Sequence, residues 1–136
     1  MKFVLDTSFI INYLRYGGKW EEKIAALRAS GEFEISVITY GELYYGSLRA
    51  SNAVKEKEKY ESFLESFEVK LIPLTTEIVK IYVQAKLALE KKGSRLDDFD
   101  LLIGATAVAS GAILVTDNEK HFARFPRLEM YMKRGD

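Results

Sequence analysis

The chain has 136 residues, 48% of them apolar, and its 20 basic residues balance its 20 acidic ones. This is enough for one hydrophobic core, so we predict a single domain over residues 1–136. A neutral chain gives no general electrostatic reason to bind nucleic acid, and such binding must come from a local patch. The absence of cysteine excludes disulfides and thiolate chemistry, and His121 is the one histidine. No segment approaches the roughly 20 apolar residues of a membrane span, and the charged start does not fit a signal peptide, so we expect a cytoplasmic protein without membrane contact.

Apolar runs and turn residues in the first half of the chain predict strands that alternate with helices. The apolar residues 3–5 predict a buried strand that stops at Asp6 and leads directly into a helix. The following elements are a helix over 9–14 ended by Gly17 and Gly18, a helix over 20–30, a strand over 34–38 and a helix opening at 39–42. The charged segment 51–61 is interpreted as a loop leading into a solvated helix that ends near Phe67.

The second half continues this alternation. We expect a strand over 69–74, a helix over 75–92 closed by Gly93, an unusually apolar and buried helix over 97–110 capped by Gly111, a central strand over 112–116, a short helix or turn over 117–125 and a last strand over 128–132. This order predicts the α/β class, as a three-layer α/β/α sandwich around a mainly parallel sheet of about five strands.

Four acidic residues follow predicted strands or open predicted helices: Asp6, Glu42, Asp100 and Asp117. A structural role competes with function at some of them, because Thr39 with Glu42 fits a capping box in the first turn of a helix. Asp97 with Asp100 likewise fits the acidic start of a helix. Parallel strands would nevertheless bring Asp6, Glu42 and Asp117 to one edge of the sheet, where ligand sites of α/β folds lie.

Carboxylates gathered at one edge repel one another and raise each other's pKa values. A divalent cation removes this repulsion, and a site with oxygen ligands alone selects Mg²⁺ or Mn²⁺ over zinc. Such an ion activates water and neutralises charge on a leaving oxygen, so these residues predict metal-assisted hydrolysis of phosphodiester bonds. The predicted catalytic and metal-binding residues are Asp6, Glu42, Asp100 and Asp117.

Three hydroxyl residues are predicted to support the site by hydrogen bonds to carboxylates or to metal-bound water, with ordinary helix capping as the alternative: Thr7, Ser8 and Thr116. Asp97 lies three residues before Asp100 and is a further supporting candidate on the same helix face. Gly104 and Ala107 continue that face, and their small size predicts a close approach of the helix to the sheet. Asp98 points elsewhere and is expected to be solvated.

Basic residues flank the expected site and are candidates for contacts with phosphates on either side of a scissile bond: Arg49, Lys92, Arg95, Lys120 and Arg124. A purely solvated role is the competing interpretation for each of them. His121 is assigned to the surface or to substrate contact. Trp20, Tyr40, Tyr44 and Tyr45 are assigned to the core or a dimer face rather than to stacking on bases.

Four blocks of this sequence resemble the PIN domain, and within it the VapC-type toxins of prokaryotic toxin-antitoxin modules. They are Leu5-Asp6-Thr7-Ser8, the run YGELYYG at 40–46, the run DLLIGATA at 100–107, and LVTDN at 114–118 followed by Phe122. Each block alone is a weak signal. All four together, in the order of the family and across nearly the whole chain, are specific.

The resemblance implies an endoribonuclease that depends on Mg²⁺ or Mn²⁺, forms a homodimer and is held inactive by a cognate antitoxin. Asp6, Glu42 and Asp100 match the acidic core of the family. The fourth acidic position of the family lies two residues after the threonine, which is Asn118 here, with Asp117 one residue earlier. Both are candidates, Asp117 as a direct ligand and Asn118 through a water.

Two alternatives to a ribonuclease remain at this stage. One is a PIN-like binding module without catalytic activity. The other is a phosphoacceptor signalling domain, which is less favoured because it requires paired acids after the first strand, where this chain has Asp6-Thr7-Ser8.

Overall fold

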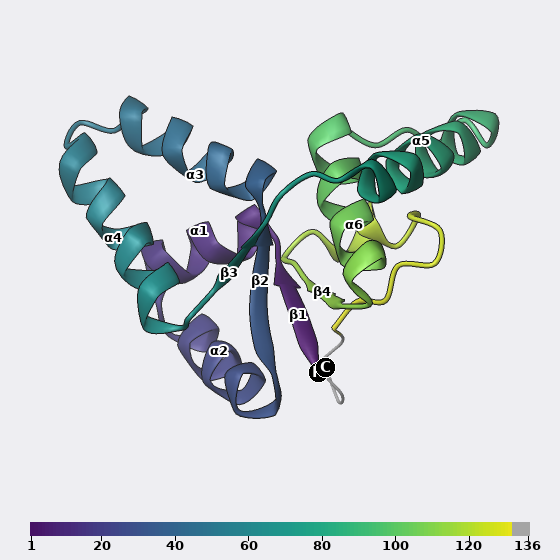
Figure 1. The fold of residues 1–136 in the computed structure, drawn as a ribbon. Helices are drawn as coiled ribbons and strands as arrows, with labels where there is room; N and C mark the ends of the chain where they lie inside the picture. The colour runs from purple at the N-terminus through teal and green to yellow at the C-terminus, as the bar shows by residue number, and fades with distance from the viewer. Residues whose placement is uncertain (132–136) are drawn as a thin grey trace.

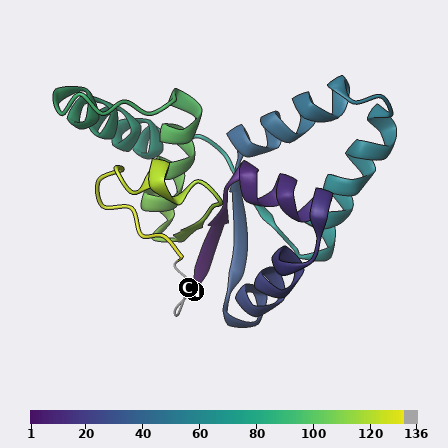
Figure 2. The ribbon, with the colours of Figure 1, turned by 180° about the vertical axis from the view of Figure 1, so that it is seen from behind.

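The computed structural model describes residues 1–131. Its elements are β1 (Lys2–Leu5), α1 (Thr7–Tyr16), α2 (Lys19–Ser30), β2 (Glu32–Ser36), α3 (Val37–Arg49), α4 (Ala53–Ser66), β3 (Lys70–Ile72), α5 (Thr76–Lys91), α6 (Asp98–Ser110), β4 (Ile113–Val115) and α7 (Glu119–Phe122). Figure 1 shows α1 to α4 on one side of the strands and α5 and α6 on the other. The view from behind in Figure 2 shows the same division. The predicted layered α/β architecture is confirmed.

Within the described part, none of the helices has the length and apolar character that crossing a membrane requires.

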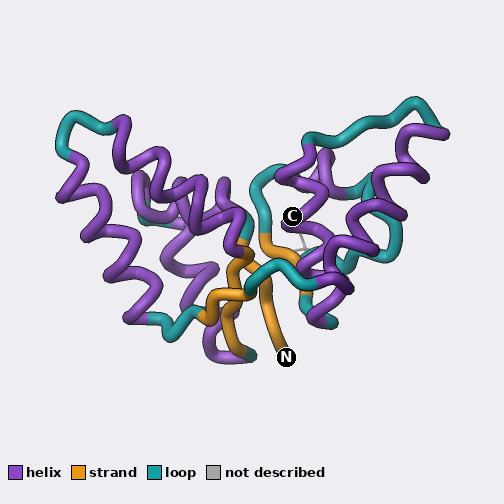
Figure 3. Tube along the Cα trace, turned by 45° about the horizontal axis from the view of Figure 1, so that its top comes forward, coloured by secondary structure: helices purple, strands orange, loops and turns teal. Residues whose placement is uncertain are grey.

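The central sheet is parallel throughout and has the strand order β3-β2-β1-β4. It lies between the two groups of helices in Figure 3. The strand predicted over 128–132 is reduced to a single bridge, in which the Leu114 N–H donates to the Glu129 carbonyl and the Tyr131 N–H donates to the Leu114 carbonyl, both at 2.8 Å. Its last residue, Met132, lies outside the described residues. The sheet therefore has four strands rather than about five. The strand over 112–116 was predicted to be central, but β4 is the last strand on one side of the sheet, with this single bridge beyond it.

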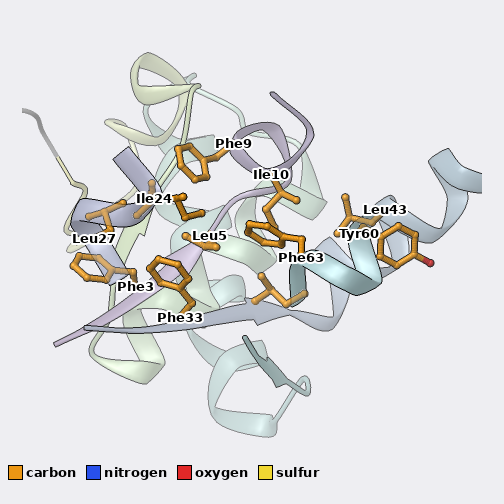
Figure 4. Packing of buried hydrophobic residues seen from close by; sticks show 12 residues of the cluster. Phe3, Leu5, Phe9, Ile10, Ile24, Leu27, Phe33, Leu43, Tyr60 and Phe63 are labelled. Carbon is orange, nitrogen blue, oxygen red and sulfur yellow. The ribbon is translucent and has the colours of Figure 1, made fainter. Parts of the chain in front are cut away.

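Alternation along β1 divides the core between the two faces of the sheet. Phe3 and Leu5 belong to the cluster covered by α1 to α4, whereas Val4 packs with Ile103 of α6 on the opposite face. The first cluster is drawn in Figure 4, where the labelled side chains are Phe3, Leu5, Phe9, Ile10, Ile24, Leu27, Phe33, Leu43, Tyr60 and Phe63. Burial on both faces holds β1 at the centre of the sheet and fixes the position of Asp6 at its end.

The structure corrects the predicted boundary between the second strand and the helix after it. The strand was expected over 34–38, but β2 ends at Ser36 and α3 begins at Val37. The Ser36 hydroxyl oxygen accepts a hydrogen bond from the Ile38 backbone N–H at 3.0 Å, which caps the helix. The β-branched residues Val37 and Ile38 favour a strand by propensity, and this local cap overrides that preference.

The segment 51–61 is also different from the prediction, since most of it is helix rather than loop. Asn52 caps α4 by accepting a hydrogen bond from the Lys55 backbone N–H at 3.1 Å. The charges that suggested a loop lie on the solvent side of the helix, while Tyr60 and Phe63 are buried on the inner side. A charge-rich amphipathic helix with few apolar residues explains the wrong prediction.

The apolar helix α6 is buried over most of its length, as predicted, and Gly111 caps it in the left-handed conformation with φ of 63°. Gly104 has a different role from the expected one. A Cβ at this position would lie 2.8 Å from ring carbons of Phe125. The small residue therefore makes room for Phe125, which packs between α5 and α6, and the expected approach to the sheet is not its reason.

Candidate active site

Asp6 lies where β1 passes into α1, and its side chain is only 2% exposed. Its Oδ2 accepts hydrogen bonds from the hydroxyls of Ser8 and Thr116, both at 2.7 Å. Asp6 is the N-cap residue of α1, and these two hydroxyl bonds, rather than a side-chain capping bond to the helix, orient its carboxylate. Burial raises the pKa of Asp6 above its ordinary value, and the two hydroxyl bonds offset part of that rise. The predicted supporting roles of Ser8 and Thr116 fit this geometry.

Glu42 lies in the second turn of α3, not in the first turn as predicted, because the helix begins at Val37. The capping box with Thr39, the competing structural interpretation, is therefore not formed, and Ser36 is the N-cap. Glu42 Oε1 instead accepts a hydrogen bond from the Thr7 hydroxyl at 2.7 Å, and the Thr7 and Thr39 hydroxyl oxygens are 3.1 Å apart. Burial raises the pKa of Glu42, the bond from Thr7 lowers it, and the negative charges of Asp6 and Asp97 raise it further.

The amino end of α6 contributes two more carboxylates. Asp97 is the N-cap and accepts a hydrogen bond from the Phe99 backbone N–H at 2.9 Å. Burial, together with the charges of Asp6, Asp97 and Glu42, raises the pKa of Asp100 to about 6, while His121 acts in the opposite direction. Asp97 thus has both of its predicted roles available, as a helix cap and as part of an acidic cluster.

Two neighbours of Asp100 are placed as the sequence suggested. Asp98 points away from the cluster, where its Oδ1 accepts hydrogen bonds from Lys86 Nζ and the Tyr82 hydroxyl, each at 2.9 Å. His121 lies on α7 with its Nδ1 4.0 Å from Asp100 Oδ2. The site side of α6 therefore carries Asp97 and Asp100, and the outer side carries Asp98.

The fourth position proposed from the sequence has a different environment. Asp117 is exposed, and its Oδ2 accepts hydrogen bonds from Asn12 Nδ2 at 2.6 Å and from Trp20 Nε1 at 2.7 Å. Asn118 donates its backbone N–H to the Thr116 hydroxyl at 2.9 Å. Asn12 was not predicted, and the one signal for it is a polar residue inside the apolar run of α1, one helical turn after Ser8. Trp20 packs against the core, in agreement with its assignment, and its indole N–H also donates to Asp117.

The predicted basic residues lie around the cluster in separate places. Lys120 and Arg124 line an open hollow of about 690 Å³ together with Thr116, Asp117 and His121. Arg49 lines another hollow, between α1, α3 and α4, that reaches Glu42. Arg95 borders a third hollow beside Asp97, and Lys92 lies exposed at the end of α5. Positive charge thus approaches the acidic cluster from more than one side.

The acidic cluster consists of Asp6, Glu42, Asp97 and Asp100, whose charges disfavour one another. Among residues 1–131, no group of three Asp, Glu or His side chains is arranged so that it could coordinate one metal ion directly. The donors are all oxygens. Asp6 is buried, Glu42 and Asp100 are partly buried, and Asp97 is exposed beside them. This chemistry suits a hard divalent cation that keeps some of its own waters.

Comparison with known proteins gives consistent matches over the whole chain. The family profile described as PIN domain matches residues 3–128. Ribonuclease VapC2 of Rickettsia felis is 30% identical over 129 residues, which cover 94% of this chain and 95% of that protein. Ribonuclease VapC1 of Methanocaldococcus jannaschii is 31% identical over 134 residues, covering 97% and 88%. The crystal structure of VapBC2 from Rickettsia felis, bound to a DNA fragment from their promoter, superposes with a TM-score of 0.90 at 27% identity, covering 96% of this chain and 98% of that one.

Proposed function

Because the chain belongs to the PIN domain family, we propose that it is an endoribonuclease and the toxin of a toxin-antitoxin pair, as the names of its relatives suggest. The observation that carries this proposal is the acidic cluster at the carboxyl edge of the sheet. Burial raises the pKa values of Asp6, Glu42 and Asp100, and repulsion from neighbouring carboxylates raises those of Glu42 and Asp100 further. Gathering partly buried negative charges costs free energy of folding, and such clusters are characteristic of sites where a bound ligand compensates the charge.

We propose Mg²⁺ or Mn²⁺ as that ligand. Asp6 and Asp100 would hold the ion, and Glu42 would complete the site or orient a water. Mg²⁺ commonly binds through one or two carboxylates and retains several waters, so a ready set of three side-chain ligands is not required. When bound, the cation activates a water and offsets negative charge on the leaving oxygen.

Three side-chain hydroxyls orient the carboxylates of Asp6 and Glu42 before the substrate binds. Ser8 and Thr116 donate to Asp6, and Thr7 donates to Glu42. Each bond selects one rotamer of a charged side chain and limits its movement when the charge around it changes. This is the usual contribution of residues that surround a metal site without binding the metal.

For the substrate, we propose that basic residues beside the cluster contact RNA phosphates. Lys120 and Arg124 are the strongest candidates because their hollow includes Thr116 and His121, which adjoin Asp6 and Asp100. Arg49, Lys92 and Arg95 are candidates for more distant phosphates. Such contacts position a strand without reading its sequence.

A protein antitoxin as partner is part of the same proposal, since the Rickettsia felis relative was crystallised as VapBC2. We also propose a homodimer, as the family resemblance implies. A toxin that cleaves cellular RNA would act in the cytoplasm.

The proposed function is tested by cleavage of a mixed RNA pool with the purified protein. We expect cleavage with Mg²⁺ or Mn²⁺ and none with EDTA. Asp100→Asn should lose about 100-fold or more, because a metal contributes several kcal/mol to the transition state. Asp98→Asn is the matched control, since it changes the adjacent carboxylate that faces Lys86 and Tyr82, and it should keep the parent activity.

Activity that survives both EDTA and Asp100→Asn would refute the metal mechanism. RNA binding without any cleavage under all of these conditions would favour the alternative of an idle binding module.

A further inference from the structure

The carboxylate of Asp117 joins three elements that are distant in the sequence. Its Oδ2 accepts one hydrogen bond from Asn12 of α1 at 2.6 Å and a second from Trp20 of α2 at 2.7 Å. Both distances are short for N–H···O bonds, as is usual when the acceptor is charged. The loop after β4 is thereby tied to both of the first two helices.

Trp20 is held by its own surroundings. The indole N–H of Trp20 is a donor only, so it requires an acceptor such as Asp117. The Trp20 ring lies 5.7 Å from the Tyr16 ring, and Lys19 Nζ lies 4.6 Å from the centre of the Trp20 ring. Only Gly17 and Gly18 separate α1 from α2, so Trp20 lies in the first turn of α2, directly after the connection between the two helices. Asp117 is consequently bonded to a side chain that packs against the core at the start of α2.

The other side of Asp117 leads to the acidic cluster. Its backbone N–H donates to the Ser8 hydroxyl at 3.3 Å, and that hydroxyl donates to Asp6. The residue before it, Thr116, also donates to Asp6, and the residue after it, Asn118, donates its N–H to Thr116. The loop that Asp117 holds therefore carries or touches both hydroxyls that orient Asp6.

From these contacts we propose that Asp117 is a positioning residue: by binding Asn12 and Trp20, it holds the Thr116 and Ser8 hydroxyls on Asp6 and thereby orients the metal-binding carboxylate. This inference rests on the proposed function. It replaces the role of direct metal ligand that the sequence suggested for Asp117.

Two substitutions at this position separate the two roles. Asp117→Asn keeps an oxygen that accepts the bonds from Asn12 and Trp20 but removes the negative charge that a hard cation prefers. Asp117→Leu removes both. We expect Asp117→Asn to stay within about tenfold of the parent activity and Asp117→Leu to fall by about 10- to 100-fold, the range typical for groups that orient a metal ligand. Glu58→Leu, which places leucine at an exposed carboxylate on α4, is the matched control and should behave as the parent.

The experiment measures RNA cleavage as a function of Mn²⁺ concentration, Mn²⁺ binding by calorimetry, and acrylamide quenching of tryptophan fluorescence. Trp20 is the one tryptophan of the chain, so quenching reports on this contact alone. We expect more efficient quenching in Asp117→Leu and parent-like quenching in Asp117→Asn, with the Mn²⁺ midpoint of Asp117→Asn unchanged.

The proposal is overturned if Asp117→Asn is as impaired as Asp117→Leu and requires more Mn²⁺, because a metal ligand would behave in that way. Full activity of Asp117→Leu overturns it as well. If Asp117→Leu does not fold, Trp20→Phe takes its place: it keeps the ring and removes the donor, and parent-like activity in this variant contradicts the proposal. Quenching and calorimetry do not require cleavage, so failure of the proposed function is seen separately, as a parent protein that cuts no RNA.

Discussion

The carboxyl of Asp100 has a pKa of about 6, against an ordinary value of 3.8, which links the stability of the metal-free fold to pH. A raised pKa means that the folded protein binds this proton more tightly than the unfolded chain does. The contribution of Asp100 to stability is therefore complete below about pH 4 and is lost as the pH rises through 6. The pKa values of Asp6 and Glu42 are shifted in the same direction and add to the trend.

We predict that, in EDTA, the free energy of unfolding decreases between pH 5 and pH 8 and that Asp100→Asn removes part of the decrease. The full shift corresponds to about 3 kcal/mol, of which about 1.4 kcal/mol falls between pH 5 and pH 8. Because the side chain is 23% exposed, we expect about 1 kcal/mol in this range after solvent screening. Urea unfolding at the two pH values measures it, with Asp98→Asn as the control. A parent protein that becomes more stable towards pH 8 would contradict the prediction, as would an unchanged pH dependence in Asp100→Asn.

For single residues, the sequence allowed the carboxylates of the site to be predicted better than the hydrogen-bond donors that contact them. Asp6 and Asp100 could be predicted because each follows or opens an apolar segment whose direction is set by burial. The bond from Thr7 to Glu42 could not, because it depends on where α3 begins, and the Ser36 cap moved that start by two residues. The contacts of Asp117 join residues about one hundred positions apart, and no local pattern reports such pairs.

Among the elements, α6 carries a conflict between helix propensity and packing at Gly104. Alanine is favoured over glycine in a helix by about 1 kcal/mol. A Cβ at Gly104, however, would lie 2.8 Å from the Phe125 ring, and Phe125 is only 4% exposed and packed in the cluster of α5 and α6. Overpacking of this kind costs about 1–3 kcal/mol, so the clash outweighs the gain in propensity.

We therefore predict that Gly104→Ala destabilises the protein by about 1–2 kcal/mol. Gly46→Ala in α3 is the matched control, because a Cβ there meets nothing within 4 Å, and it should stabilise by about 0.5–1 kcal/mol. Thermal or urea unfolding measures both. Combining Gly104→Ala with Phe125→Leu should recover part of the loss, and stabilisation by Gly104→Ala alone would show that Phe125 moves aside at little cost.

For the molecule as a whole, the order of strands and helices could be predicted because burial on two faces leaves a strong pattern. The strands β1 and β4 are largely apolar runs, and a glycine follows the end of α1, α2, α5 and α6 within two residues. The two main errors, over 34–38 and 51–61, arose where a single capping side chain decided the boundary against propensity or charge. The resemblance to the PIN domain, drawn from four short blocks, is confirmed by the match over residues 3–128, and it leaves the phosphoacceptor alternative without support.

The neutral charge of the whole chain makes the salt dependence of RNA binding a test of where the binding surface lies. Without a general positive field, affinity must come from a few local contacts, and each phosphate neutralised on a single strand contributes about −0.7 to the slope of log K against log salt. Three or four contacts give a slope of about −2 to −3. We predict that Lys120→Gln makes this slope about 0.7 less steep in the Asp100→Asn background, in which cleavage is slowed by about 100-fold or more, because Lys120 lines the hollow beside His121 and Thr116. Lys57→Gln is the control, since Lys57 pairs with Glu61 on α4, and it should leave the slope unchanged.

Fluorescence anisotropy of a labelled single-stranded RNA over a salt series measures the slopes. Binding that is insensitive to salt would show that RNA is not held through phosphate contacts, and equal effects of the two lysines would place the contacts outside the hollow beside the acidic cluster.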